Sequence, residues 1–341
     1  MSYNFQELND DDLLDPFSLS NPSFTQAKFY GDWQKKLKRT VRRFVALRDK
    51  DEISTYFQLI KYPLPFGKSY LYTPYGPRIA DTSKEFLLEL KEKLLAIAKE
   101  ENAIFVRLDF TPTISNKILS EIFTEAPAYT YHSAYFQPRT EWVLKLEPSI
   151  ETLLKKMHKN TRYSIRVAET KNVTTEIVTN NFEQYFETFY ILMQETATRN
   201  KFGLHPKEYY KNIFNSLSTI PNSYLSIARF GETILTINLI IIYGKVANYV
   251  FAGTSTKERD RMPASGALWR AICFAKEIGC TDFNFGAVTS EEDTNHSWDG
   301  LSLFKKRFGG EELKHSDFFD AVLSPFWYHL YNLRKRIRNN K

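Results

Sequence analysis

Three consecutive cations, Lys305, Lys306 and Arg307, lie in a short segment that is bounded by glycines, residues 300 to 310. The apolar residues of this segment recur at helical spacing: Leu301, Phe304 and Phe308. When an amphipathic helix buries such a stripe, the lysines are left near its edge, where an ammonium can meet a phosphate or a developing oxyanion. A solvated helix face explains the same pattern, so both interpretations stay open at this point.

Two other groups of residues have types and spacing that suit chemistry. Asp109 follows a buried-looking run that contains Arg107, and it is either a reactive carboxylate at a strand end or a cap or ion-pair partner of that arginine. Arg162 and Arg166 are four residues apart and present two guanidinium groups on one helix face. They suit phosphate binding, and intramolecular ion pairs with Glu169 or other acidic residues are an equally open alternative.

The length and composition of the sequence indicate a folded, soluble chain with two domains. The chain has 341 residues, of which 43% are hydrophobic and 15% aromatic. It has no apolar run long enough to cross a membrane, and its acidic start, residues 1 to 15, lacks the features of a secretory signal. We therefore expect a cytoplasmic protein.

Several classes of site are not supported. Cys273 and Cys280 have no partner at ligand spacing, and the six histidines form no triad or metal spacing with them, so no metal site is expected. The chain contains neither a GxSxG motif nor a Walker loop.

The net charge of +6 is unevenly distributed. Basic residues crowd residues 35 to 43 and again residues 334 to 338. Such clusters fit nucleic-acid phosphates, anionic lipid head groups or phosphorylated substrates, and solubility is the open alternative.

Hydrophobic periodicity predicts an α+β chain of two units. The first unit, residues 1–147 completed by 318–341, is expected to contain these elements: a helix at 25–37, strands at 41–47, 53–60 and 68–73, a helix at 83–100, a strand at 103–110, a helix at 115–123, a strand at 141–146 and a terminal helix at 325–338. The start of the chain is expected to be loose.

The second unit, residues 148–317, is expected to begin with two helices. Its predicted elements are these: helices at 149–157 and 161–170, a strand at 173–178, helices at 181–199 and 206–217, strands at 224–229, 233–243 and 246–253, a helix at 264–278, a strand at 282–285, the basic segment and a strand at 312–319. This order resembles that of the GNAT acyltransferases, and the resemblance implies two GNAT-like lobes that face each other across a cleft.

The loop that would bind acyl-CoA in a GNAT protein corresponds here to residues 261–266. The family pattern R/Q-x-x-G-x-G/A uses backbone N–H groups at a helix start to hold the pyrophosphate. In this chain Ala264 replaces the first glycine and Pro263 removes one donor. The sequence therefore argues against CoA as the cofactor.

An ordered set of short motifs resembles the FemABX family of aminoacyl-tRNA-dependent transferases. The motifs are these: Phe24-Thr-Gln26 through Trp33 and Lys35-Lys36, Phe105 to Asp109, Lys159 to Glu169, His205-Pro206 with Tyr209-Tyr210, Tyr249 to Thr254, Trp269, Phe283 to Ala287, and Gly300 to Gly310, which matches GxxxFKxxFGG. Asn284 stands where members usually have aspartate, and Ala287 where they usually have a second glycine. The element spacing leaves no room for a long helical hairpin insertion, so the chain resembles the compact type.

The resemblance implies transfer of an amino acid from aminoacyl-tRNA to the stem-peptide amine of a peptidoglycan precursor, UDP-MurNAc-pentapeptide or lipid II. It implies no cofactor beyond the aminoacyl-tRNA co-substrate. The roles that it implies are these: Lys305 stabilises the oxyanion or the phosphates of the tRNA end, Asp109 takes or relays the proton of the amine, Lys36, Tyr210, Tyr249, Phe304 and Lys306 bind substrate, and Arg162 and Arg166 contact tRNA.

Two alternatives of different classes remain, an N-acyltransferase that uses acyl-CoA and a non-catalytic tRNA-binding module. We expect a monomer. The basic C-terminal segment, residues 327–341, suggests peripheral contact with the inner leaflet of the cytoplasmic membrane.

Overall fold

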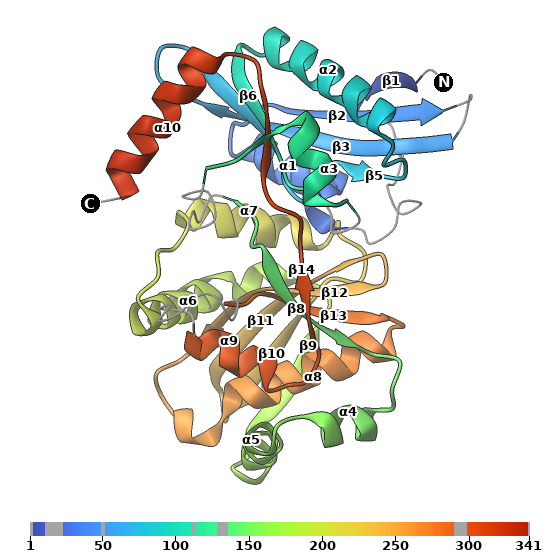
Figure 1. Ribbon diagram of the computed structural model, residues 1–341. Coiled ribbons are helices and arrows are strands. Elements are labelled where there is room, and N and C mark those ends of the chain that lie inside the picture. Colours follow the sequence, from blue (N-terminus) through green and yellow to red (C-terminus); the bar gives the residue numbers. More distant parts are fainter. Residues whose placement is uncertain are drawn as a thin grey trace. The chain divides into compact units, whose positions relative to one another are not determined.

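The computed structural model describes residues 3–10, 23–48, 52–110, 114–127, 136–289 and 299–339 (Figure 1). The chain forms two compact units, Met1–Arg139 with Lys314–Lys341, and Thr140–Leu313. Each unit contains one mixed sheet with helices packed on it, which confirms the expected α+β class.

The first unit is built on a sheet with the order β1-β2-β3-β4-β6-β15-β7, in which β5 pairs with β3. Its strands are β1 Tyr3–Leu8, β2 Val41–Arg48, β3 Glu52–Pro63, β4 Ser69–Thr73, β5 Arg78–Ile79, β6 Ala103–Leu108, β7 Thr124–Glu125 and β15 Phe319–Val322. Its helices are α1 Lys28–Lys36, α2 Lys84–Glu100, α3 Asn116–Ile122 and α10 Pro325–Asn339, and a 3₁₀ turn, Phe24–Gln26, precedes α1. The neighbours β4 and β6 run parallel, whereas the other pairs are antiparallel.

Helix α2 covers one face of this sheet because its apolar residues recur at helical spacing. Ser83 caps its first turn by accepting a hydrogen bond from the N–H of Phe86. Leu87, Leu90 and Leu94 are fully buried in the same core as residues of β2, β3 and β6. The helix therefore begins at a defined polar cap and packs along one stripe.

The other face of the sheet carries an aromatic core that includes residues of α10. Arg107 on β6 is fully buried and forms a bidentate ion pair with Asp320 on β15, with N···O distances of 2.9 and 2.7 Å. The hydroxyl of Tyr328 on α10 donates to the same carboxylate at 2.6 Å. This network joins β6 to β15 and the terminal helix, although Arg107 and Asp320 are 213 positions apart in the sequence.

The second unit is built on a sheet with the order β14-β8-β13-β12-β11-β10-β9. Its strands are β8 Thr140–Lys145, β9 Thr174–Val178, β10 Tyr224–Phe230, β11 Thr233–Tyr243, β12 Val246–Thr254, β13 Asp282–Ala287 and β14 Glu311–Lys314. Its helices are α4 Ile150–Lys156, α5 Lys159–Thr170, α6 Phe186–Asn200, α7 Lys207–Leu217, α8 Pro263–Glu277 and α9 Asp299–Lys306, with 3₁₀ turns at Phe182–Tyr185 and Arg259–Arg261. Here β12 and β13 are the parallel neighbours.

Helices α6 and α8 pack on this sheet at close range. A Cβ on Gly253 of β12 would lie 2.7 Å from the Cβ of Leu192 on α6, so glycine is required where helix and strand touch. The hydroxyl of Ser226 on β10 donates to the carbonyl oxygen of Ala267 on α8 at 2.7 Å. These contacts fix both helices against the central strands.

Three expectations about the elements were wrong. The strand expected at 141–146 as the end of the first unit is β8, which pairs with β13 in the second sheet. The strand expected at 312–319 is two strands, β14 and β15, in different sheets. Part of the start that was expected to be loose forms β1, because residues 3–8 find a partner in β2.

The unit boundaries therefore fall at 139/140 and 313/314 rather than at the expected 147/148 and 317/318. Residues 11–15 of the acidic start lie outside the described residues. Within the described ranges, none of the helices has both the length and the apolar composition that crossing a bilayer requires.

Candidate active site

The parallel strands of the second sheet separate at their carboxyl ends. The register of β12 with β13 ends at Asn248 and Asn284. Beyond that point β12 continues along β11 to Thr254, whereas β13 continues along β8 to Ala287. Carboxyl ends of parallel strands that diverge in an open sheet are a preferred place for ligands.

A glycine pair holds the basic helix α9 against this edge of the sheet. Gly309 and Gly310 both have positive φ, +87° and +107°. A Cβ on Gly310 would overlap the carbonyl oxygen of Val143 on β8, and the indole N–H of Trp142 donates to the Gly309 carbonyl at 2.8 Å. Positive φ favours glycine at both positions, and close contact with β8 additionally requires glycine at position 310.

Lys305 lies at the end of α9 with its ammonium directed to the end of β13. Its Nζ donates to the carbonyl oxygen of Ala287 at 2.7 Å. Burial lowers the pKa of Lys305 to about 8, and the carboxylate of Glu141 acts in the opposite direction. An ammonium has three N–H donors, so a cation held here retains the capacity to donate to a ligand oxygen.

The neighbours of Lys305 extend the same cluster. Lys306 donates to the carbonyl oxygen of Thr289 at 3.1 Å, and its Nζ lies 5.4 Å from the ring centre of Trp142. Phe304 packs edge-on against Phe308, with ring centres 5.4 Å apart. The structure therefore brings three of the predicted residues, Lys305, Lys306 and Phe304, into one cluster.

Asn284 has a backbone contact at this strand end. Its side-chain oxygen accepts a hydrogen bond from the N–H of Gly286, at 2.8 Å, where the chain turns with a φ of +72°. An aspartate could accept the same bond, so this departure from the family pattern leaves the contact intact. Ala287, the second departure, supplies the carbonyl that binds Lys305.

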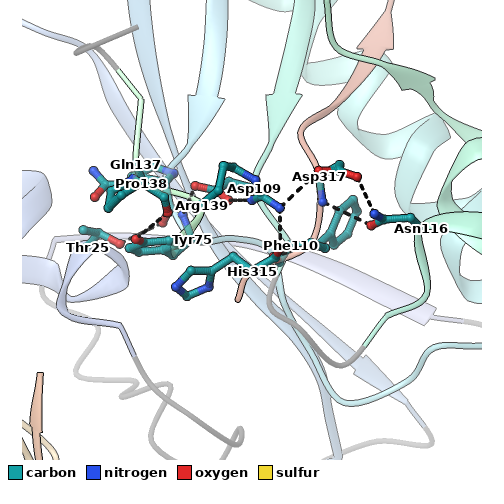
Figure 2. Close-up of polar contacts among 12 residues, drawn as sticks. Thr25, Tyr75, Asp109, Phe110, Asn116, Gln137, Pro138, Arg139, His315 and Asp317 are labelled. Carbon is teal, nitrogen blue, oxygen red and sulfur yellow. Dashed lines mark hydrogen bonds and ion pairs between the residues drawn. The ribbon is translucent and has the colours of Figure 1, made fainter. Parts of the chain in front are cut away.

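In the first unit Asp109 is fully buried at the carboxyl end of β6, beside the end of the parallel partner β4. Figure 2 shows the surrounding contacts. One carboxylate oxygen accepts from the hydroxyl of Tyr72 at 3.0 Å and from the N–H of Tyr75 at 3.2 Å. The other oxygen lies 3.4 Å from Nη1 of Arg139. The carboxylate thus meets three donors from two segments, β4 with its following turn and the approach to β8.

Opposed effects determine the pKa of Asp109. Burial raises its pKa to about 6, while Arg139, His315 and the hydrogen bonds from Tyr75 and Tyr72 work against that rise. The alternative of an ion pair with Arg107 was wrong, because Arg107 pairs with Asp320 instead.

Arg139 links this carboxylate to residues 315–317, which follow β14 and belong to the same unit. Its guanidinium also contacts the carbonyl oxygen of His315 and lies 3.6 Å from the carboxylate of Asp317. The ring of His315 stacks on Tyr75, with ring centres 4.2 Å apart, and the Tyr75 hydroxyl donates to the carbonyl oxygen of Pro138 at 2.9 Å. The result is a polar network built on Asp109 (Figure 2).

The remaining predicted residues lie elsewhere in their units. Tyr210 on α7 is buried, and its hydroxyl accepts from the N–H of His205 at 3.3 Å. Tyr249 on β12 is half-buried near Phe283, and burial raises its pKa. Lys36, in the last turn of α1 in the first unit, is exposed.

The two arginines of α5 differ in their surroundings. Arg162 donates to the carbonyl oxygens of Lys155 and Met157, at the end of α4. Arg166 is exposed. Within the described residues neither forms an ion pair with Glu169, which was the alternative left open by the sequence.

The loop expected to be a degraded CoA site begins α8 with Met262 at a φ of +56°. The N–H groups of Ser265 and Gly266 both donate to the carbonyl oxygen of Met262, at 3.1 and 3.3 Å. A Cβ on Gly266 would lie 3.1 Å from the Cβ of Ala168, because α5 packs against this helix start. Pro263 supplies no donor.

Sequence reasoning missed the residues that surround the two candidate groups. They are Tyr72, Tyr75, Arg139 and His315 around Asp109, and Glu141 and Trp142 beside α9. The one available signal was the run Arg139-Thr-Glu141-Trp142 at the start of β8, which places a cation, a carboxylate and an indole close together at the start of a strand. Among the described residues no three histidine, cysteine, aspartate or glutamate side chains are grouped as metal ligands, and His132 and His296 lie outside those residues.

Comparisons with known proteins agree on fold and family. The model of the FemAB family matches residues 119–229 and 219–336. The lipid II:glycine glycyltransferase of Staphylococcus saprophyticus is 22% identical over 374 aligned positions, covering 88% of this chain and 88% of that protein. The crystal structure of FemX aligns with a TM-score of 0.79 at 20% identity, covering 92% of this chain and 95% of that one.

A tandem GNAT protein from the clavulanic acid biosynthesis pathway aligns with a TM-score of 0.52 at 9% identity, covering 95% of this chain and 99% of that one. The fold is therefore the one seen in FemX and in tandem GNAT proteins, with two GNAT-like units. Because the family match covers more than half of the sequence, this chain belongs to the FemAB family, and it is an aminoacyltransferase.

Proposed function

We propose that this chain transfers an amino acid from aminoacyl-tRNA to the stem-peptide amine of a peptidoglycan precursor in the bacterial cytoplasm. The observation that carries the proposal is a desolvated lysine cation, Lys305, held at the splayed strand ends by the motif that defines the family resemblance. The acceptor named for the S. saprophyticus relative, lipid II, supports this class of acceptor.

The reaction is an aminolysis of an ester. The amine nitrogen attacks the ester carbonyl carbon, a C–N bond forms, and the C–O bond to the terminal ribose of the tRNA breaks. One proton leaves the attacking nitrogen and one returns to the ribose oxygen. The protein must align two large anionic substrates, accept and return a proton, and stabilise the tetrahedral oxyanion.

Lys305 is our candidate for the oxyanion role. Its ammonium is fixed by the Ala287 carbonyl, and it is partly withdrawn from water, where a hydrogen bond to a developing negative charge is strengthened. At pH 7 a group with a pKa of about 8 is still mainly charged. Lys306 and Phe304, on the same turn of α9, are candidates to bind substrate beside it.

Asp109 is our candidate to take or relay the proton of the attacking amine. A carboxylate whose pKa is raised to about 6 is ionised at pH 7 but is a stronger base than an ordinary aspartate. Its hydrogen bonds to Tyr72 and Tyr75 also position the turn after β4. Replacing Asp109 should lower activity whether the carboxylate acts as the base or only positions this turn. The pH dependence of kcat/KM distinguishes the two roles.

The other candidates supply binding. Lys36 and Arg166 are exposed cations that suit phosphate oxygens of the precursor and of the tRNA respectively. Tyr249 presents a half-buried ring beside the splayed strands. The Tyr210 hydroxyl accepts from the N–H of His205, and the Arg162 guanidinium donates to the carbonyl oxygen of Met157. We propose that these bonds position the backbone at His205 and the start of α5 for substrate.

The proposal is tested by product mass. The protein is incubated with a pool of charged tRNA and, in parallel reactions, with UDP-MurNAc-pentapeptide or lipid II. The expected result is a precursor heavier by one or more amino acid residues, which also identifies the amino acid and the acceptor. Transfer from an acyl-CoA thioester and none from tRNA would refute the proposal, as would tRNA binding with no product.

A further inference from the structure

Helix α10 carries a continuous stripe of exposed apolar side chains. Phe326, Leu330, Leu333 and Ile337 are 73%, 43%, 48% and 57% exposed. Their spacing of four, three and four residues places them on one narrow face of the helix. A contiguous exposed apolar face of this kind marks an interaction surface more strongly than scattered exposed residues do.

The opposite face of α10 already has its partner. Trp327, Tyr328 and Tyr331 pack into the aromatic core on β4 and β6. The hydrogen bond from Tyr328 to the buried Asp320 fixes the rotation of the helix about its axis. The exposed stripe is therefore held outward by the fold.

A second element of the first unit adds an aromatic ring beside this helix. Phe66, in the turn between β3 and β4, is 81% exposed and has a φ of +60°, a conformation that is unfavourable for a bulky residue. Its ring centre lies 5.8 Å from that of Trp327. The turn and the helix thus place their exposed apolar groups side by side.

The charged residues of α10 itself have one sign. Residues 321–341 contain no aspartate or glutamate. At helical spacing Arg334 and Arg336 fall on the two flanks of the stripe, and both are exposed, with no ion pair among the residues that the structure describes. Lys68, next to the Phe66 turn, has its Nζ 5.8 Å from the ring centre of Trp327.

We propose that this surface, formed by Phe66, Phe326, Leu330, Leu333 and Ile337 with flanking Arg334 and Arg336, docks the protein on an anionic phospholipid bilayer. An apolar stripe bordered by cations lies in the boundary between head groups and acyl chains, where the stripe is buried and the cations meet lipid phosphates. RNA offers the phosphates but no hydrocarbon to cover the stripe. The inference stands on the surface itself and does not depend on the proposed reaction.

The test is flotation of the full-length protein with vesicles of phosphatidylglycerol mixed with phosphatidylcholine, and with vesicles of phosphatidylcholine alone. We expect flotation with the anionic vesicles, weakened by salt, and little with the neutral ones. Truncation before α10 is unsuitable because it removes Tyr328, whose hydroxyl donates to the buried Asp320, and exposes the aromatic core on β4 and β6. Leu330→Ser with Leu333→Ser is expected to weaken binding roughly a hundredfold, since each exposed leucine contributes about tenfold when it is buried in lipid.

Matched variants separate this surface from general properties of the chain. Leu88→Ser removes a leucine of similar exposure, 45%, from α2 and should leave flotation unchanged. Arg334→Glu with Arg336→Glu should weaken binding to anionic vesicles at least 25-fold, roughly fivefold for each cation lost. Lys117→Glu with Lys155→Glu makes the same charge change at exposed sites elsewhere and should have a much smaller effect.

Three outcomes would overturn the proposal. The first is absence of flotation with anionic vesicles, and the second is equal flotation of the stripe variants and the parent. The third is a concentration-dependent dimer that Leu330→Ser with Leu333→Ser dissociates, without any vesicle binding, which would assign the stripe to a second copy of the chain. Circular dichroism of each variant verifies that it is folded.

Discussion

Replacing Lys305 by methionine should reduce catalysis strongly without unfolding the protein. Methionine retains an unbranched apolar stem of similar length and removes the ammonium. If the ammonium stabilises the oxyanion, its loss should lower kcat about 10²–10³-fold, the range found when one oxyanion donor is removed. Single-turnover transfer from charged tRNA under saturating acceptor measures this effect.

The stability of the same variant can be estimated from the structure. The pKa of Lys305 falls from 10.5 to about 8 on folding, which means that burying the charged form costs about 3 kcal/mol. The methionine variant avoids this cost, but it leaves the Ala287 carbonyl without its hydrogen-bond donor, which destabilises it by about 1–3 kcal/mol. We therefore expect the free energy of unfolding at pH 7 to stay within about 2 kcal/mol of the parent value, with no large loss.

The pH dependence has a definite sign. The folded state releases the Lys305 proton near pH 8 and the unfolded state near pH 10.5, so the unfolded state binds more protons between these values. The cost of the buried cation is present in full below about pH 8 and is relieved as pH rises through this window. The parent is therefore stabilised as pH rises through this window, whereas the methionine variant is not, so the free energy of unfolding of the variant relative to the parent should fall. The kcat of the parent should also fall above about pH 8, because the Lys305 cation is lost.

Lys245→Met, an exposed lysine in the turn between β11 and β12, is the control for loss of a positive charge. The reasoning is wrong if Lys305→Met keeps more than about a tenth of kcat. It is also wrong if the variant loses more than about 3 kcal/mol of stability, since Lys305 would then be a structural residue.

Three further predictions concern other features of the fold. The acid limb of the kcat/KM profile should follow a group with a pKa of about 6, because Asp109 must be ionised to accept a proton, and Asp109→Asn should abolish this limb along with most activity. Asp320→Ala leaves the buried Arg107 charge without its partner and should cost about 3–5 kcal/mol in urea unfolding. Gly310→Ala should lower the free energy of unfolding by more than about 2 kcal/mol, because the new Cβ overlaps a carbonyl of β8, whereas Gly309→Ala should cost about 1 kcal/mol from its backbone conformation alone.

Each of these has its own control. An unchanged acid limb in the Asp109 variant would assign the pKa to another group. Glu187→Ala, which breaks an exposed ion pair with Lys207, should cost less than about 1 kcal/mol, and a similar loss in Asp320→Ala would mean that burial of the pair is not decisive. Equal effects at the two glycines would contradict the overlap with β8.

The sequence predicted local features well because their signals are local. The periodicity of α2, the turn at Gly244 between β11 and β12, and the amphipathic α9 with its glycines are all encoded within short windows. The motif containing Lys305 was found in the same way. The hydrogen-bond partner of Lys305, the Ala287 carbonyl, was not predicted, because the sequence pattern does not show that the end of β13 lies beside α9.

The errors arise where the outcome depends on pairing between distant segments. The strand β8 is continuous in pattern with the first unit, and only its pairing with β13 assigns it to the second. Asp320 was not predicted as the partner of Arg107 because 213 positions separate them in sequence. The network around Asp109 likewise joins residues of β4, β6, the approach to β8 and the segment after β14, which no short window contains.

The insertion of residues 140–313 between two parts of the first unit has a consequence for synthesis on the ribosome. The second unit has its whole sheet once β14 has emerged, so it can fold while the chain is still growing. The first unit must wait, because β15 lies between β6 and β7 and brings the carboxylate that neutralises Arg107. A nascent chain halted just before residue 318 would therefore hold one finished lobe and one lobe with an open sheet edge and an uncompensated charge, a form that chaperones and proteases should recognise.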